Sequence, residues 1–586
     1  MGYAILSHRK NRSADTAVKT GACLPINGTF PRAPLFLKRF ENFKNAVRRL
    51  KVLLGKPDPF AAAEIGANVM DQRDLLIKNG KILCMDGGRC ADWLLTHDGK
   101  VSRLGVGDCR PEYISGTVQT IDAKGRTVLP GFIDNHFEVV RLGLEWGCVD
   151  LSPARNYEQM GQILRREAAK RSVITAYHLD SSCLEEKALP DRRVLDRYCA
   201  DKPVLIFSLD RHTIMLNTVG ILYYKIPFTL PGIQTDENGI LTGIFTNQAE
   251  NRLESNVMDT YSYDDFDKAA ALISKIALSY GVTTVAAMEC RGAQAEQAPL
   301  RASDFLVRYK DRYPLTIEIF YQTTECKRAL EQGLKHIGGA LYIDGTMGGR
   351  SAALSFDYAD APHKRGWVYL TRDALTRFTM ECCQHDLQIG YDAIGDMAIE
   401  AVLQALEAAA EKYDVPAMRH RIEHAELITP SQMERAARLG VILCMQPGYE
   451  GLWGYPGGMY QQRLGAHYGT TNRFRRIIDS GVTVCAGADP PVTHINPLLG
   501  IHYAVNHPVP ANSATLQEAL EMYTVNGAYA LFLEKQKGSL REGMDADIVI
   551  LDRDITQTDP QQLKEVKVDM TIKDGRVVFN RMASLC

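Results

Sequence analysis

Four strand-like apolar stretches of the chain end in side chains of the types that bind metal ions. The first leads into His136 and Glu138, and later ones lead into Asp392, His424 and Asp489. Residues two apart on a strand share a face, so His136 and Glu138 can point to one centre. Two imidazoles and three carboxylates meeting at one place could hold one divalent cation or two. The sequence therefore predicts a metal site built from strand ends.

Each of these residues, taken alone, also has a purely structural interpretation. A histidine at the end of a strand can be a hydrogen-bonded structural residue, and an aspartate there often caps the next helix. A structural polar network without a metal therefore stays an alternative for the five residues together.

The middle of the chain, 130–535, must supply the elements that position these residues. Apolar runs at 203–208, 282–288, 441–445 and 482–487 alternate with amphipathic helices, such as the one predicted at 396–412. Alternation of this kind over about 400 residues predicts a parallel (β/α)₈ barrel with insertions. Chemistry in such a barrel lies at the carboxyl ends of the strands, which is where the five residues stand.

The two segments that flank the middle have a different texture. Residues 73–129 and 536–586 contain short alternating strands separated by Asn-Gly or Asp-Gly steps, which are hairpin signals. We therefore predict a small composite β-sandwich built from both segments, in addition to the α/β barrel.

Residues 1–72 form a basic N-terminal extension. Residues 1–56 carry twelve Lys and Arg against two acids, whereas the remaining chain has a net charge of −12. Within 36–54, apolar residues recur at helical spacing opposite a basic face. This amphipathic helix could contact anionic lipid or a partner, or simply lie on the acidic body of its own chain.

The composition excludes several classes of protein. The chain has 586 residues, 45% of them apolar and 24% charged, and no run long enough to span a membrane. Its 14 cysteines are scattered without a disulfide or zinc-ribbon pattern. These features predict a reduced, cytoplasmic enzyme with a small-molecule substrate and no nucleic acid as partner. We also expect a homo-oligomer.

Several motifs occur in an order that resembles the amidohydrolase superfamily. The sequence is similar to its amidohydrolase-3 branch, the YtcJ-like and N-substituted formamide deformylase-like enzymes, over about 72–580. The matching segments are Leu-Pro-Gly-Phe-Ile-Asp at 129–134, Asp-Arg-His at 210–212, Ile-Asp-Gly-Thr-Met-Gly-Gly-Arg-Ser at 343–351, Ala-Ile-Gly-Asp at 393–396, Arg-Ile-Glu-His-Ala at 421–425, Arg-Leu-Gly at 463–465, Gly-Ala-Asp-Pro at 487–490 and Gly-Ser-Leu-Arg-Glu-Gly at 538–543. The resemblance implies a metal-containing barrel and a small β-sandwich.

The sequence departs from this family at three ligand positions. Glu138 and Asp392 stand where the family has histidine, and Ala340 stands where it has a lysine that is carboxylated to bridge two metals. The new carboxylates shift the preference toward hard cations such as Mn²⁺, Fe²⁺ or Mg²⁺. We expect one divalent ion, Mn²⁺, Fe²⁺ or Zn²⁺, because the bridging group is missing.

The resemblance implies hydrolysis of a C–N bond in a small, partly apolar amide or formamide. Asp489 would take a proton from the attacking water and give it to the leaving nitrogen. His212 and Arg350 are candidates to bind the substrate or stabilise its oxyanion. A lyase, decarboxylase or isomerase on the same scaffold, or a catalytically silent binding protein, are the alternatives. A segment rich in glycine and aromatics at 446–460 is either a cover over the pocket or a loop packed on itself.

Overall fold

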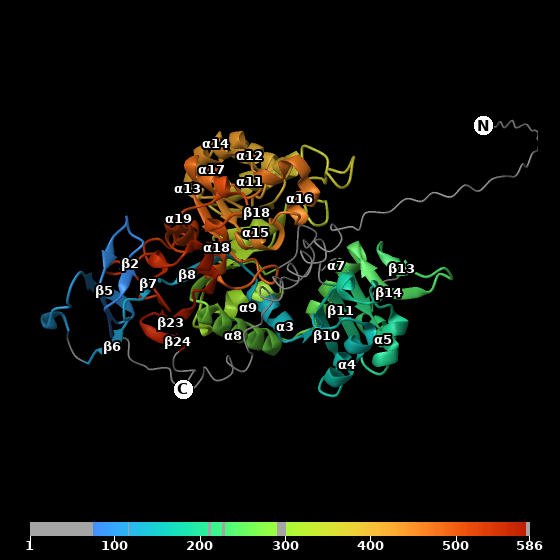
Figure 1. Cartoon of the computed structure of the whole chain (residues 1–586). Coiled ribbons are helices and arrows are strands. Elements are labelled where there is room, and N and C mark those ends of the chain that lie inside the picture. Colours follow the sequence, from blue (N-terminus) through green and yellow to red (C-terminus); the bar gives the residue numbers. More distant parts are fainter. Residues whose placement is uncertain (1–73, 115–116, 209–212, 226–228, 290–300, 582–586) are drawn as a thin grey trace, which may run out of the picture. The chain divides into compact units, whose positions relative to one another are not determined.

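The computed structural model describes residues 74–114, 117–208, 213–225, 229–289 and 301–581 (Figure 1). Eight parallel strands form one sheet in the order β8, β15, β16, β17, β18, β19, β20 and β21. Their bounds are Phe132–Phe137, Val282–Ala287, Thr316–Tyr321, His336–Tyr342, Gln388–Ala393, Arg421–His424, Ile442–Met445 and Val484–Ala486. The predicted (β/α)₈ barrel is therefore confirmed.

Backbone contacts between the first and last strands nearly close the barrel. The Asp489 amide donates to the carbonyl of His136 at 3.0 Å, and the Ala488 amide donates to the Asp134 carboxylate at 3.0 Å. A Cβ at Gly487 would lie 2.4 Å from the His136 nitrogen, so only glycine lets the two strands approach this closely. This approach brings Asp489 beside His136.

Helices follow the barrel strands along the chain. They are α3 (Val139–Trp146), α8 (Tyr263–Ser279), α9 (Arg301–Tyr309), α10 (Cys326–Glu331), α11 (Arg372–Gln384), α12 (Asp396–Ala410), α13 (Val415–Met418), α14 (Pro430–Arg438), α15 (Gly448–Trp453), α16 (Met459–Leu464), α17 (Phe474–Asp479), α18 (Pro497–Val505), α19 (Leu516–Met522) and α20 (Val525–Ala530). In α12 the predicted periodicity is confirmed, because Ile399, Val402, Leu403 and Leu406 are all fully buried. The Ser262–Asp265 capping box fixes the start of α8.

A second sheet interrupts the barrel after its first strand. It has the order β13-β14-β12-β11-β10-β9, with bounds Ile233–Thr235, Leu241–Thr246, Thr213–Leu216, Val204–Ser208, Ile174–Leu179 and Val149–Asp150. The accompanying helices are α4 (Tyr157–Ala168), α5 (Arg192–Tyr198), α6 (Thr218–Tyr224) and α7 (Asn247–Thr260). The apolar run at 203–208 thus belongs to this sheet and not to the barrel, because its strand pairs antiparallel with β12.

Two further sheets contain the strands of the chain's flanking segments. One has the order β5-β4-β1-β6, with bounds Lys100–Gly105, Trp93–His97, Leu75–Lys78 and Gln119–Asp122. The other has the order β24-β23-β22-β7-β2-β3, with bounds Arg576–Asn580, Val568–Lys573, Ile548–Leu551, Thr127–Pro130, Lys81–Leu83 and Cys90–Ala91. Antiparallel pairing of β7 with β22 joins the two flanks, so the predicted composite of both segments is confirmed.

One prediction concerns residues that the structure does not describe, and another is tested only within the described residues. The basic extension at 1–72 and its helix at 36–54 lie outside the described residues. Among the helices of the described ranges, none is both long enough and apolar enough to cross a membrane.

Candidate metal centre

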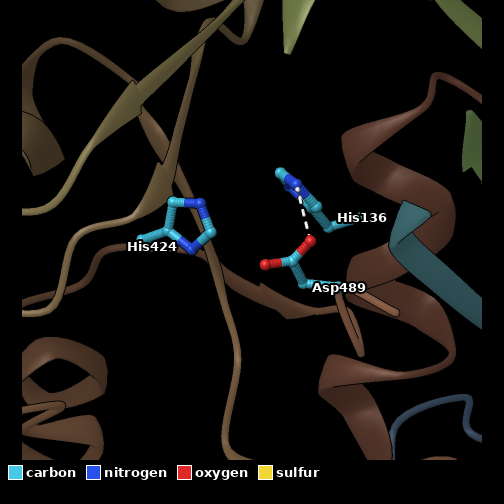
Figure 2. Close-up of side chains that lie close together, drawn as sticks. All are labelled: His136, His424 and Asp489. Atoms are coloured by element: carbon cyan, nitrogen blue, oxygen red, sulfur yellow. Dashed lines mark ion pairs between the residues drawn. The ribbon is translucent and has the colours of Figure 1, made fainter. Parts of the chain in front are cut away.

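Three of the predicted ligands come together at the carboxyl ends of the barrel strands. Ligand atoms of His136, His424 and Asp489 all lie within 4.8 Å of one another (Figure 2). The Nε2 atom of His136 is 3.5 Å from the Oδ1 atom of Asp489, and the two imidazole centroids are 5.1 Å apart. Residues that are far apart in the sequence thus share one centre.

The backbone bends sharply at two of these ligands. His424 and Asp489 have φ values of 70° and 50°, in the left-handed region that non-glycine residues rarely adopt. Such conformations cost about 1–3 kcal/mol each and concentrate at functional sites. Here they turn the two side chains at the points where β19 and β21 end.

His136 is oriented by a buried ion pair beneath it. Its Nδ1 atom lies 3.0 Å from Glu423 Oε2, and Arg421 holds both oxygens of that carboxylate at 2.9 Å. Burial alone would raise the pKa of Glu423, but the Arg421 charge and the His136 hydrogen bond lower the pKa to about 2. Because Glu423 is ionised, it accepts the Nδ1 proton. When the imidazole is neutral, the lone pair of Nε2 therefore faces the centre.

His424 is oriented by an amide instead of a carboxylate. Its Nδ1 atom lies 2.7 Å from Gln446 Oε1, and Gln446 Nε2 donates to the Cys444 carbonyl at 3.2 Å. The second contact fixes the orientation of the amide, so Oε1 accepts from Nδ1–H. His424 Nε2 then faces Asp392 Oδ2 at 3.2 Å. Burial lowers the pKa of His424, but the charge and hydrogen bond of Asp392, together with the charges of Asp489 and Glu426, outweigh burial and raise the pKa to about 10.

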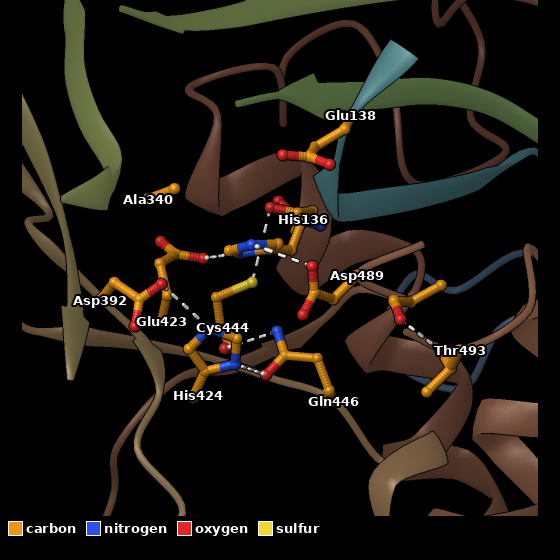
Figure 3. Close-up of polar contacts among 12 residues, drawn as sticks. His136, Glu138, Ala340, Asp392, Glu423, His424, Cys444, Gln446, Asp489 and Thr493 are labelled. Atoms are coloured by element: carbon orange, nitrogen blue, oxygen red, sulfur yellow. Dashed lines mark hydrogen bonds and ion pairs between the residues drawn. The ribbon is translucent and has the colours of Figure 1, made fainter. Parts of the chain in front are cut away.

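His136, His424 and Asp489 are spaced to hold one divalent ion, and Asp392 contacts His424 from outside that group. Ligand atoms at about 2.0–2.2 Å from a tetrahedral ion are separated by roughly 3.4 Å. The observed separations of 3.5 Å for His136–Asp489 and 3.2 Å for His424–Asp392 agree with that value (Figure 3). Hydrogen bonding of each Nδ1 to an oxygen acceptor is also typical of metal-binding histidines.

Glu138, the fifth predicted ligand, has a different partner. It precedes the first residue of α3, and its Oε1 atom lies 3.0 Å from Arg141 Nη1. Arg141 also pairs with Glu254 at 2.8 Å. The structure therefore does not bring Glu138 into the group of three, and its assignment as a ligand stays a prediction.

Of the two predicted substrate-binding residues, the structure describes only Arg350. Arg350 forms two hydrogen bonds with the carboxylate of Asp360, at 3.0 and 2.8 Å, and Arg463 contacts the same carboxylate. His212 lies outside the described residues. Substrate binding by Arg350 and His212 stays a prediction.

The residues that orient the ligands were not predicted from the sequence. Glu423 and Arg421 lie in the same motif as His424, and alternation along β19 places both on the face opposite to Ile422. Gln446 directly follows β20, so the strand-end rule could have found it. Position along a strand was therefore a sufficient signal for all three.

The aromatic segment after β20 reaches the centre. It folds into the short helices α15 and α16, and the hydroxyl of Tyr449 in α15 donates to Asp489 Oδ2. Tyr449, Trp453 and Tyr460 pack on one another, with centroid distances of 4.6 and 5.9 Å. This segment thus packs both on itself and on a predicted ligand.

Comparison with known proteins identifies the group to which this fold and site belong. The profile of the amidohydrolase family matches residues 119–579. The chain belongs to the amidohydrolase family. The matches to two relatives cover most of this amidohydrolase and most of each relative. YtcJ of Bacillus subtilis is 27% identical over 84% of this chain and 95% of its own. The N-substituted formamide deformylase of Arthrobacter pascens is 24% identical over 87% and 99%.

Solved structures support the same assignment. A structure titled as an uncharacterized metal-dependent hydrolase from Pyrococcus furiosus is 25% identical to this amidohydrolase, with a TM-score of 0.69. The match covers 83% of this chain and 100% of that chain. A second such structure, from Pyrococcus horikoshii, is 24% identical with a TM-score of 0.70 and shows the same fold.

Ala340 in this amidohydrolase offers no ligand atom from its side chain. It is 5% exposed, and its backbone amide donates to Gln322 Oε1 at 3.1 Å. A bridging carbamate cannot form on an alanine.

Proposed function

We propose that this amidohydrolase hydrolyses a C–N bond in a small, partly apolar amide or formamide with the help of one divalent ion. His136, His424, Asp489 and Asp392 would hold the ion. The observation that carries the proposal is the grouping of ligand atoms of His136, His424 and Asp489 within 4.8 Å, with each imidazole fixed through Nδ1. The similarity to an N-substituted formamide deformylase supports the substrate class.

One ion accounts for the charges better than two. Ala340 supplies no bridging group, and Glu138 is paired with Arg141. Below the ligands, Arg421 and Glu423 cancel each other's charge. The charge of one divalent ion would balance the charges of Asp392 and Asp489.

The chain's own groups would manage the protons of the reaction. A divalent ion bound here would lower the pKa of a water molecule and polarise the scissile carbonyl. Asp489 would accept a proton from the attacking water and deliver it to the leaving nitrogen. Its side chain is 18% exposed, against 4% for His136 and 6% for His424, so it is the ligand that solvent and substrate reach most easily.

Metal reconstitution followed by assay tests the proposal. The chelator-treated protein is loaded with Mn²⁺, Fe²⁺ or Zn²⁺, and we expect about one ion per chain by elemental analysis. No bound ion under any condition would refute the proposal. The loaded protein is then assayed on a panel of amides and formamides. A bound ion without hydrolysis of the panel would instead favour a lyase, decarboxylase or isomerase.

A pair of aspartate variants tests the role of Asp489. Asp489→Asn should lower kcat by about 10²-fold or more, as for loss of a general acid–base group. Asp479→Asn is the matched control, because Asp479 is 62% exposed and pairs with Arg475 in α17. Equal activity of the two variants would exclude Asp489 from proton transfer.

A further inference from the structure

Tyr449 contacts a proposed metal ligand from outside the set of ligands. It is 4% exposed, and its hydroxyl donates to Oδ2 of Asp489. The other oxygen of that carboxylate, Oδ1, lies 3.5 Å from His136 Nε2. The two oxygens of Asp489 therefore face different partners.

Packing determines where the Tyr449 hydroxyl lies. The tyrosine ring stacks on the His424 ring, with centroids 5.9 Å apart and planes inclined by 12°. The Trp453 ring also contacts the tyrosine ring, with centroids 4.6 Å apart and planes inclined by 59°. Contacts with two aromatic neighbours limit the conformations of the Tyr449 side chain, so its hydroxyl already lies at the carboxylate.

The tyrosine acts as the donor in this contact. A phenol carries an O–H donor, whereas an ionised carboxylate only accepts, so the proton in this contact comes from Tyr449. The aspartate is held on its second side by its own backbone, because the Asp489 amide donates to the His136 carbonyl at 3.0 Å.

We propose that Tyr449 is a positioning residue that makes Asp489 a one-oxygen ligand, with Oδ1 presented to the metal and Oδ2 retained by the phenol. This inference rests on the proposed metal site. Carboxylates bind ions through one oxygen or two, and a second bond from Asp489 would take up a coordination position. Retention of Oδ2 keeps that position open for water and substrate, as a catalytic site requires.

The first test is the structure of the native protein loaded with Zn²⁺. We expect only Oδ1 of Asp489 at bonding distance, about 2.0–2.2 Å, with Oδ2 on the Tyr449 hydroxyl. Both oxygens bonded to the ion would overturn the inference. Absence of any ion would instead refute the proposed function, so the two failures are distinguishable.

The second test compares two tyrosine variants in a metal competition assay. Tyr449→Phe should weaken Zn²⁺ affinity about tenfold or more, as expected when the partner of a ligand is lost. It should also change the visible spectrum of the Co²⁺-loaded protein. Tyr358→Phe is the control. Tyr358 belongs to the same apolar cluster as Tyr449, but its hydroxyl donates to the Ala352 carbonyl at 2.9 Å. Equal affinities and spectra for the two variants would overturn the inference.

Discussion

Replacement of Arg421 by methionine tests whether the ion pair beneath His136 is a stabilising element of the barrel. Arg421 and Glu423 are both fully buried and share two hydrogen bonds of 2.9 Å. Arg421 also donates to the Asn135 carbonyl at 2.6 Å. Arg421→Met would leave the Glu423 carboxylate buried without its cation.

The pKa of Glu423 gives the size of the expected loss. A decrease from 4.5 to about 2 corresponds to about 3 kcal/mol of unfolding free energy at neutral pH. Removal of one partner of a buried pair costs about 3–5 kcal/mol, in agreement with that value. Because the pKa of Glu423 is lowered by folding, its contribution is present above pH 4.5 and is lost as the pH falls toward 2. The difference between native protein and variant should therefore shrink over that interval.

Urea unfolding of the metal-free protein measures this loss. We expect Arg421→Met to lower the unfolding free energy by about 3 kcal/mol at pH 7. A change below about 0.5 kcal/mol, as for an ordinary surface substitution, would refute the reasoning.

A double variant separates stability from metal binding. Arg421→Met with Glu423→Leu removes both charges, so most of the stability should return. The same variant removes the acceptor of His136 Nδ1, and its metal affinity should stay about tenfold or more below native. Full recovery of metal affinity would show that His136 does not depend on Glu423.

Three further predictions follow from the same geometry. Gln446→Leu removes the acceptor of His424 Nδ1 and should weaken metal affinity about tenfold, measured by competition with a chromophoric chelator; an unchanged affinity would contradict this. Since the pKa of His424 is about 10 in the metal-free site, metal binding at pH 8 should release about one proton from it, and affinity should rise with pH up to that value. Calorimetry in buffers of different ionisation enthalpy measures this, and zero release would contradict it. Gly487→Ala should destabilise the barrel by about 1–3 kcal/mol or more, because its Cβ would lie 2.4 Å from the His136 nitrogen. Gly469→Ala, with open space around it, is the control and should unfold like the native protein.

Local sequence patterns predicted the elements of this fold where one face is buried. The spacing of Ile399 and Val402 predicted α12, and the apolar runs at 282–288 and 441–445 became β15 and β20. The run at 203–208 was equally apolar, yet it pairs in the separate sheet. An apolar run indicates that a strand is buried, but a buried strand has the same pattern in either sheet. The pattern therefore does not indicate to which sheet the strand belongs.

The partners of charged side chains could not be predicted in the same way. Glu138 and Asp489 are both carboxylates at strand ends, but Arg141 pairs with Glu138 while Asp489 remains with the two histidines. Arg141 lies one helical turn after Glu138, a spacing at which oppositely charged side chains can pair. This local signal was not used in predicting Glu138 as a ligand. The contact of Tyr449 with Asp489 joins separate strand ends, and no spacing in the sequence encodes it.

The sequence by itself determined which ligand types exist and that they stand at the ends of barrel strands, because strand periodicity and barrel topology are properties of local pattern. The tertiary structure decided which of them share one centre. That choice depends on distances of a few ångströms between strands far apart in the chain, and on the left-handed backbone at His424 and Asp489 that aims their side chains. Electrostatic and coordination energies change steeply over such distances, so only the folded arrangement determines which carboxylate meets a cation and which meets an arginine.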